Sequence, residues 1–228
     1  MLSFGLPYFS CFARLDVVLT FTKDPLVTSS SLILASDSPR RHQLLKQIGV
    51  NFTVSGQDID EHILDQESPE EFVSRMADEK AKAALQSNMK KNVIILAADT
   101  VVVCGDLVLG KPKDKSDALR MLRQLSNRTH RVLSAVTVAT TINQKSVMSD
   151  TLVHFREISE KEAEEYWETG EPKGKAGAYG IQGFGAVFVQ LINGSYSGVM
   201  GLPLYETAKL LSEFGILTWR PVQGLPYE

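Results

Sequence analysis

The sequence predicts an α/β fold in which a mixed, twisted β-sheet is flanked by helices and holds a cleft between two lobes. Val93–Val103 is a long apolar run, which is typical of a strand buried on both faces. Segments with apolar residues at helical spacing alternate with such runs along the chain. Two turn signals, Gly105-Asp106 and Asn143-Gln144, join neighbouring strands directly and indicate antiparallel pairs within the same sheet.

The length of 228 residues suits one large domain or two small ones, and no internal repeat or low-complexity linker divides the chain. We expect an N-terminal extension over residues 1–30, a single domain over 31–218 and a tail over 219–228. Within the extension, Arg14 and Asp16 interrupt the apolar part, which does not fit a secretory signal. A disordered or loosely packed extension is therefore expected, with an organelle signal or an extra strand as alternatives.

Composition and charge exclude several classes of partner. The formal net charge is −3, so no global basic field is present to hold nucleic acid or an anionic membrane. No apolar run reaches the roughly 18 residues that a membrane span needs. The two cysteines are too few for a disulfide framework, and the four histidines show no metal spacing. We expect a cytoplasmic protein that binds neither nucleic acid nor membrane, and any polyanion must meet a local cluster of cations.

The first predicted elements are a strand, a turn and two helices. Ser31–Ser36 is a short apolar run typical of a buried strand. Arg40–Ile48 follows with helical spacing and ends at Gly49. Ser68–Glu71 forms a capping box with proline at the first helical position, and the apolar stripe of the helix that it opens runs to Leu85.

The second half of the chain continues the alternation of strands and helices. Its glycine-rich stretch, residues 177–185, is assigned to neither type. After Val93–Val103 the predicted elements are a strand over Leu107–Leu109, a helix over Lys115–Leu125, a hairpin of Val132–Thr140 and Lys145–Phe155, a helix from the capping box at Ser159–Glu162 to Gly170, a strand over Val187–Ile192 and a helix over Pro203–Phe214.

Asp99 is the sharpest polar break in these patterns, because it lies inside a strand whose two faces are apolar. An isolated buried carboxylate is costly, and a raised pKa or a neighbouring cation relieves that cost. Asp99 is either a strand-end residue bound to backbone or a general base or metal ligand at the edge of the sheet. Thr100 supplies a hydroxyl at the same edge.

Lys80 lies on or beside the buried stripe of its helix, seven residues after Val73 and four after Met76. An ordinary surface lysine avoids such a face. The side chain either extends its charged end to solvent along the apolar surface or serves a polar site.

Arg40 and Arg41 lie in the first turn of a predicted helix, directly after a strand and a tight turn. Cations favour the opposite end of a helix, so two arginines here are unusual. They are explained if an anion binds the free N–H groups of that helix end and the guanidinium groups hold it, although a solvated arginine pair is the alternative.

Neither of two glycine-containing segments matches a known nucleotide-binding motif. Gly105–Lys111 has the spacing of a phosphate-binding loop, but Pro112 stands where a serine or threonine is needed, so Lys111 remains a lone cation at a hairpin end. The glycines of residues 175–185 do not match a dinucleotide fingerprint. They indicate backbone close to a ligand or to another chain segment, and Gln182 offers an amide that can pair with a base edge.

Taken together, these segments resemble the Maf family. The match runs from about Leu32 to Phe214 and implies a fold related to the inosine triphosphatases. Several motifs in a fixed order are far more specific than any one of them. The motifs, in the order of the family, are SDSPRRHQLL, IDE, DEKA, AADTVV, GKP, KAGAYGIQGFG and INGSYSGVMGLPLYET.

The resemblance implies a house-cleaning nucleoside triphosphate pyrophosphatase that yields a nucleoside monophosphate and pyrophosphate, with Mg²⁺ or Mn²⁺ as cofactor and a homodimer as the assembly. KAGAYGIQG and INGSYSGVMGLP resemble the branch that acts on dTTP and UTP. Two alternatives stay open. One is a pyrophosphatase for 7-methyl-GTP or another modified nucleotide, and the other is a non-catalytic nucleotide-binding regulator of septum formation.

Residue roles follow from the same resemblance. Asp99 resembles the proton acceptor, and Glu61 or Asp99 would hold the metal. The expected catalytic residues are Asp99, Lys80 and Lys111, and the expected substrate-binding residues are Ser36, Arg40, Arg41, Thr100 and Gln182. The sequence departs from the family at Asp37, which adds a negative charge beside the phosphate site, and at Gly110, where the dTTP/UTP branch often has glutamate.

Overall fold

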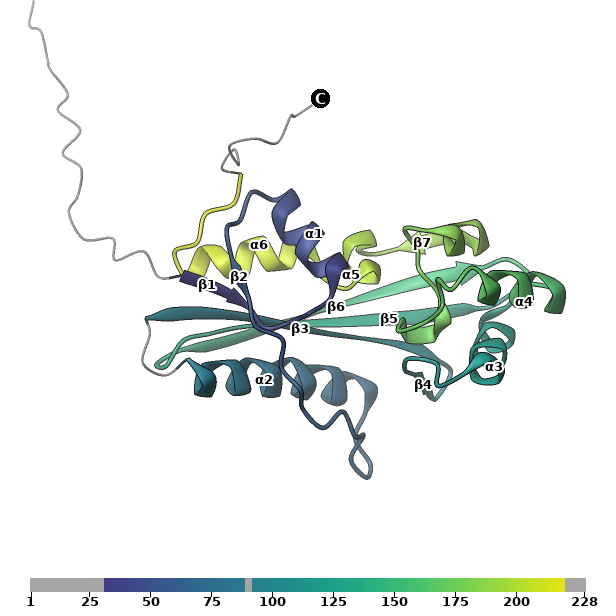
Figure 1. Cartoon of the computed structure of the whole chain (residues 1–228), viewed down its shortest axis with the longest axis horizontal. Coiled ribbons are helices and arrows are strands. Elements are labelled where there is room, and N and C mark those ends of the chain that lie inside the picture. Colours follow the sequence, from purple (N-terminus) through teal and green to yellow (C-terminus); the bar gives the residue numbers. More distant parts are fainter. Residues whose placement is uncertain (1–30, 89–91, 220–228) are drawn as a thin grey trace, which may run out of the picture.

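A seven-stranded mixed sheet forms the centre of the computed structural model, which describes residues 31–88 and 92–219 (Figure 1). The strand order is β2-β1-β3-β5-β6-β7, and β4 pairs with β3. β1 is parallel to β2 and β3, and the other pairs are antiparallel, so the mixed sheet predicted from the sequence is confirmed. The expected extension 1–30 and, except for Trp219, the expected tail lie outside the described residues. The strands are β1 (Ser31–Leu34), β2 (Thr53–Val54), β3 (Val93–Cys104), β4 (Leu107–Leu109), β5 (Thr129–Ala139), β6 (Gln144–Phe155) and β7 (Val189–Asn193).

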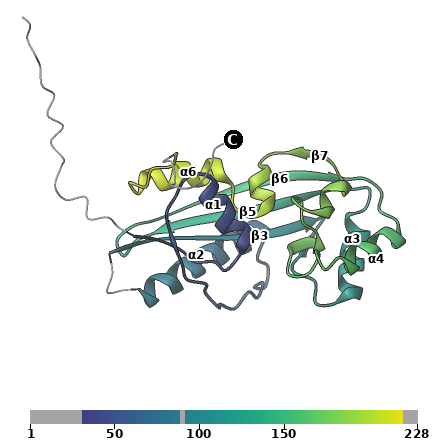
Figure 2. The ribbon, with the colours of Figure 1, turned by 45° about the horizontal axis from the view of Figure 1, so that its top comes forward.

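Helices cover both faces of the sheet, with α2 on one face and α1 and α6 on the other (Figures 1 and 2). Leu45 of α1 and Leu211 of α6 pack in one buried cluster with Leu96, whereas Met76 of α2 packs with Leu133 on the opposite face. None of the described helices is long and apolar enough to cross a membrane. The helices are α1 (Pro39–Gln47), α2 (Pro69–Ser87), α3 (Lys115–Leu125), α4 (Glu160–Glu168), α5 (Tyr196–Met200) and α6 (Leu204–Glu213), with 3₁₀ helices η1 (Ala176–Ala178) and η2 (Phe184–Phe188).

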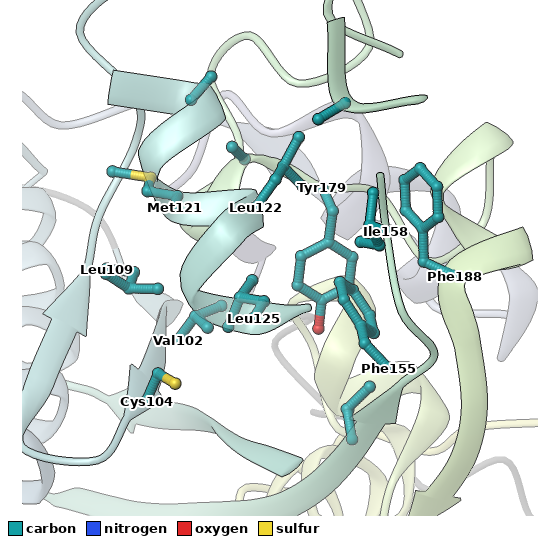
Figure 3. Packing of buried hydrophobic residues seen from close by; sticks show 14 of the residues in the cluster. Val102, Cys104, Leu109, Met121, Leu122, Leu125, Phe155, Ile158, Tyr179 and Phe188 are labelled. Carbon is teal, nitrogen blue, oxygen red and sulfur yellow. The ribbon is translucent and has the colours of Figure 1, made fainter. Parts of the chain in front are cut away.

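A separate hydrophobic cluster fills the end of the sheet that carries α3 and α4. Figure 3 shows Leu122 and Leu125 of α3 near Phe155 of β6 and Tyr179 of the glycine-rich segment. The rings of Phe155 and Tyr179 meet edge to face, with centroids 4.7 Å apart. β3, β5 and β6 run from one lobe, which contains α1, α2 and α6, to the other, which contains α3 and α4 (Figure 1). A residue in the middle of β3 therefore lies where the two lobes meet.

Most element boundaries agree with the sequence prediction, and the differences have local causes. The capping boxes at Ser68 and Ser159 are both present, each with reciprocal side-chain and backbone hydrogen bonds. The strand predicted at Val187–Ile192 begins two residues later, because η2 occupies residues 184–188. The first strand of the predicted hairpin begins at Thr129 rather than Val132. β2 and α5, with two and five residues, are too short to show a periodicity and were not predicted.

Candidate active site

A buried lysine joins two carboxylates at the junction of the lobes. Nζ of Lys80 lies 2.7 Å from Oε1 of Glu61 and 2.6 Å from Oδ1 of Asp99, and the lysine side chain is 10% exposed. α2 delivers Lys80 because its buried stripe packs on the sheet, and the middle of β3 delivers Asp99. The ion pair compensates the charge of Asp99, so the carboxylate is satisfied by a cation rather than by backbone among the described residues. Lys80 does not extend to solvent.

Glu61 carries this cluster outward to the hairpin between β3 and β4. Its Oε2 lies 3.5 Å from Nζ of Lys111, which is well exposed at the end of β4. Burial raises the pKa of Glu61, but the hydrogen bonds and positive charges of Lys80 and Lys111 outweigh burial and leave that pKa below its ordinary value. Glu61 is therefore ionised at neutral pH and links a buried cation to an exposed one.

These residues line a cavity of about 360 Å³. Its lining carries four cations and three carboxylates, so the cavity is positive although the chain as a whole is negative. An anion with several charges is the ligand that this balance favours. The cations are Arg40, Arg41, Lys80 and Lys111, and the carboxylates are Asp37, Glu61 and Asp99.

The two arginines of α1 point to the sheet and to the C-terminal end of α5. Arg41 donates to Ser36 Oγ at 3.2 Å, to Thr100 Oγ1 at 3.3 Å and to the carbonyl oxygen of Gly201 at 2.8 Å. Nε of Arg40 donates to the carbonyl oxygen of Met200 at 3.4 Å. Burial lowers the pKa of both guanidinium groups, yet arginine stays protonated in proteins, so both charges are available to a ligand.

The start of α1 is open to the same cavity. The side chain of Ser38, the residue before the helix, makes no capping hydrogen bond, and Pro39 occupies the first helical position. Asp37 and Ser38 line the cavity together with the arginines. Free N–H groups at a helix start favour an anion, and Asp37 opposes this by adding a negative charge, as the sequence predicts. Gly56 makes room for that carboxylate, because a Cβ at residue 56 would lie 1.8 Å from Oδ2 of Asp37.

A second, smaller cavity of about 60 Å³ adjoins the first. The two cavities share Ser38, Arg40 and Arg41, so a ligand held by the arginines can occupy both. The lining of the smaller cavity has three charged side chains against seven in the larger one, and it includes the ring of Tyr179 and the amide of Gln182, which suits a flat polar group. That lining includes Thr100, Val102, Lys175, Tyr179, Gly180, Gln182 and Gly201.

The structure brings together every side chain that the sequence singled out for the site. These side chains line the two cavities, and the two arginines line both. The larger cavity is lined by Ser36, Arg40, Arg41, Glu61, Lys80, Asp99 and Lys111, and the smaller one by Arg40, Arg41, Thr100 and Gln182.

Glu171 lines neither cavity but holds the loop that carries Gln182, and sequence reasoning missed it. Its carboxylate accepts hydrogen bonds from the hydroxyl of Tyr166 at 2.7 Å, the amide of Phe184 at 2.8 Å and the amide of Gly185 at 3.0 Å. The amide of Gly180 in turn donates to the Tyr166 hydroxyl at 3.0 Å. The loop that carries Gln182 is thus folded around one carboxylate.

The glycines of this loop are the sequence signal that could have located Glu171. A Cβ at Gly183 would lie 2.1 Å from Oε2 of Glu171, and one at Gly185 would lie 2.7 Å from the hydroxyl oxygen of Tyr166. Of the two explanations that the sequence leaves open, these two glycines therefore make room for another chain segment. Gly177, at φ +67°, packs instead against the side chain of Val102.

The donor set of the larger cavity suits a hard divalent cation shared with a ligand. In the described residues no group of three or more His, Cys, Asp or Glu side chains is spaced to hold a metal ion. Mg²⁺ is commonly held by one or two carboxylates together with phosphate oxygens. Glu61 and Asp99 line the same cavity, and each has a second carboxylate oxygen that Lys80 does not bind. They therefore fit that pattern.

Comparison with known proteins points to one family. The sequence model of the family described as "Maf-like protein" matches residues 31–214. A protein of Pseudoalteromonas atlantica named dTTP/UTP pyrophosphatase is 51% identical over 187 residues, which cover 81% of this chain and 97% of that protein. A dTTP/UTP pyrophosphatase of Vibrio vulnificus is 50% identical over 183 residues, with 80% and 98% covered. One of Cupriavidus metallidurans is 50% identical over 197 residues, with 82% and 98% covered.

A solved structure, that of the Staphylococcus aureus Ham1 protein, aligns with a TM-score of 0.40 and 17% sequence identity. The alignment covers 55% of this chain and 72% of that chain. At this level of similarity it adds nothing to the assignment of the site.

Proposed function

The chain belongs to the family of Maf-like proteins, and on that premise we propose that it is a nucleotide pyrophosphatase that hydrolyses dTTP and UTP to the nucleoside monophosphate and pyrophosphate. The observation that carries the proposal is the buried Lys80, which holds Asp99 and Glu61 in a positive cavity that shares two arginines with a second, less charged cavity. A polyphosphate is highly charged and a nucleobase is not, which matches the difference in charge between the larger and the smaller cavity.

The phosphates belong in the larger cavity. A triphosphate carries about four negative charges near neutral pH. Arg40, Arg41 and Lys111 would compensate these charges, and the buried Lys80 would add a fourth positive charge. Since phosphoryl transfer depends mainly on positioning and charge stabilisation, this arrangement supplies most of what the reaction needs.

Asp99 acts as the general base. It accepts a proton from the attacking water while the bond between the α- and β-phosphates breaks and pyrophosphate leaves. Lys80 holds Oδ1 of Asp99, so among the described residues Oδ2 is the oxygen free to face water in the cavity. The hydrogen bond therefore orients the carboxylate as well as compensating its charge.

A divalent cation, Mg²⁺ or Mn²⁺, belongs to the same proposal. Glu61 and Asp99 would hold it together with phosphate oxygens of the substrate. When bound, it would neutralise charge that develops on the phosphates.

The base belongs in the smaller cavity, whose lining includes Gln182, Thr100 and Arg40. The amide of Gln182 offers both a donor and an acceptor to a base edge. We assign these three residues to nucleobase choice within the proposed function.

The test is pyrophosphate release from the full-length protein across the canonical nucleotides and 7-methyl-GTP, with Mg²⁺ and with Mn²⁺. Rates highest for dTTP and UTP, and dependent on the added metal, are expected. A preference for 7-methyl-GTP would replace the proposed substrates, and no release from any nucleotide would leave only the binding role in septum formation.

The assembly and the location are part of the same proposal. Met148, Leu152 and Leu191 are exposed on one face of β6 and β7, and this supports a homodimer formed through that face. Sedimentation of the protein and of Leu191→Lys tests it, and a monomer in both would contradict it. The small number of cysteines supports a cytoplasmic location, and the net charge of −3 supports the absence of nucleic acid or an anionic membrane as partner.

A further inference from the structure

Thr100 and Ser134 form a chain of hydroxyl groups behind the smaller cavity. They are directly opposed on β3 and β5, and their Oγ atoms lie 2.8 Å apart. Ser134 is fully buried, and its Oγ lies 2.7 Å from the carbonyl oxygen of Gly198, whereas Thr100 lines the cavity. Ser134 itself does not line either cavity.

The number of protons decides the direction of each hydrogen bond in this chain. Each hydroxyl has one proton, and a carbonyl oxygen can only accept, so Ser134 donates its proton to Gly198. Ser134 can then only accept from Thr100. The proton of Thr100 goes to Ser134 at 2.8 Å or to the carbonyl oxygen of Gly201 at 3.5 Å, and both acceptors belong to the protein.

Arg41 completes the pattern on the other side of Thr100. A guanidinium group has no acceptor, so Nη2 of Arg41 donates to Thr100 Oγ1 at 3.3 Å and takes one of its two lone pairs. Thr100 therefore offers the cavity an acceptor and no donor.

We propose that Ser134 is a positioning residue that fixes Thr100 as a hydrogen-bond acceptor and thereby favours uracil and thymine over cytosine. This rests on the proposed function. N3 of uracil and thymine carries a proton, whereas N3 of cytosine is an acceptor and would face the lone pair of Thr100. Two acceptors forced together where the bound base displaces water lose a hydrogen bond on each side, so we expect a preference of about tenfold or more.

A preference for CTP would indicate that Thr100 faces position 4 of the base rather than N3. The amino group at position 4 of cytosine is a donor, so a Thr100 acceptor that faced position 4 would favour CTP. The relatives named dTTP/UTP pyrophosphatase favour the N3 arrangement. Substitution of Ser134 distinguishes the two, because it frees the proton of Thr100 and leaves the rest of the cavity in place.

The experiment compares kcat/KM for UTP and CTP in the full-length protein and in Ser134→Ala. We expect the CTP to UTP ratio to rise about tenfold, mainly through KM, because the freed proton of Thr100 can turn to N3 of cytosine. Thr137→Ala is the matched control, since Thr137 is also buried on β5 but lies outside both cavities. It should leave the ratio unchanged.

Two further variants separate positioning from a general loss of structure. Ser134→Cys replaces the hydroxyl by a weak donor and acceptor and should give an intermediate ratio even if Ser134→Ala does not fold. In Thr100→Val, which has no hydroxyl, Ser134→Ala should no longer change the ratio, because the two residues act through one hydrogen bond.

The outcomes separate this proposal from the proposed function. If the unmodified protein releases no pyrophosphate from either nucleotide, both fail. If it is active but neither Ser134→Ala nor Ser134→Cys raises the CTP to UTP ratio, or if the change persists in Thr100→Val, the role of Ser134 alone is overturned.

Discussion

Nζ of Lys80 lies 2.6 Å from Oδ1 of Asp99, and this ion pair joins the buried face of α2 to the middle of β3. Both groups are largely withdrawn from solvent, with side-chain exposures of 10% and 14%. Charges in such a place are stable only in pairs, so each residue fixes the position of the other. The proposed base of the reaction is therefore held by the same helix that packs the core.

Substitution of Asp99 by asparagine should abolish most of the activity and leave the fold intact. Asparagine keeps the shape of the side chain but cannot accept a proton, and Lys80 retains Glu61 as a partner. Loss of a general base costs about 10²–10⁴ in rate. Pyrophosphate release and circular dichroism of Asp99→Asn check this, with the exposed Asp106→Asn as control. Turnover at the wild-type level would show that Asp99 is not the base.

Lys80→Met should damage both stability and catalysis, whereas Lys82→Met on the same helix should do neither. Methionine fills the buried volume but leaves Asp99 without its cation, while Glu61 keeps only the exposed Lys111. Removing one partner of a buried ion pair costs about 3–5 kcal/mol, and we expect the lower part of that range because Glu61 is 43% exposed. Lys82 is exposed and serves as the matched control. Urea unfolding with steady-state kinetics measures both effects, and equal behaviour of the two variants would contradict the role of Lys80.

Gln182→Ala should change the ranking of dTTP, UTP and CTP more than it lowers the best rate. Gln182 lines the smaller cavity and lies away from the Lys80 and Asp99 pair, so its loss removes a contact to the base and leaves the chemistry in place. A nucleotide panel with Gln190→Ala, an exposed glutamine on β7, as control provides the measurement. An unchanged ranking would remove Gln182 from base selection.

Glu171→Gln should raise KM for UTP about tenfold with a smaller change in kcat. The amide side chain of glutamine can accept fewer of the hydrogen bonds from Tyr166, Phe184 and Gly185, so the loop that carries Gln182 loosens. Burial raises the pKa of Glu171, but these hydrogen bonds outweigh burial and keep the pKa low. The contribution of the carboxylate is therefore present above the ordinary glutamate pKa and is lost only as pH falls through the lowered value.

Glu168→Gln is the control for that prediction, since Glu168 is exposed and binds Lys115 rather than the loop. The pH dependence of KM distinguishes a local role of Glu171 in holding the loop from a general effect on folding. KM of the wild type should stay constant down to pH values near the ordinary glutamate pKa, while Glu171→Gln should show the raised KM at every pH. A loss of kcat with KM unchanged would assign Glu171 to another role.

The sequence predicted those parts of the site that depend on regular structure. Lys80 stood out because a helical period placed it on a buried stripe, and Asp99 because it interrupted an apolar strand. Glu61 lies in the long segment between β2 and α2, where no period relates one residue to the next, so only the family resemblance could place it. Nothing local to Glu171 indicated its role, because an acidic residue after the helix-ending Gly170 is ordinary; the signal lay ten or more residues away, in the glycines that make room for it.

His130 gives the fold a pH dependence that the reaction does not use. It is 2% exposed, its Nε2 lies 2.9 Å from the Tyr179 hydroxyl, and its ring meets Phe155 edge to face. Burial lowers the pKa of His130 to about 4, below its ordinary 6.5. A histidine with a lowered pKa in the folded state binds its proton more readily when unfolded, so its contribution to stability is complete above about pH 6.5 and declines as pH falls towards 4.

Over that interval we expect a loss of about 3 kcal/mol in the free energy of unfolding, since each pKa unit corresponds to about 1.4 kcal/mol. Urea unfolding of the full-length protein at pH 7 and pH 4 measures the loss. His130→Gln cannot titrate and should lose less stability over the same interval, although it starts from a lower value because the packing with Phe155 is reduced. His154→Gln is the control, as His154 is only half-buried. If His130→Gln and the wild type lose equal stability between these pH values, the acid sensitivity originates elsewhere in the chain.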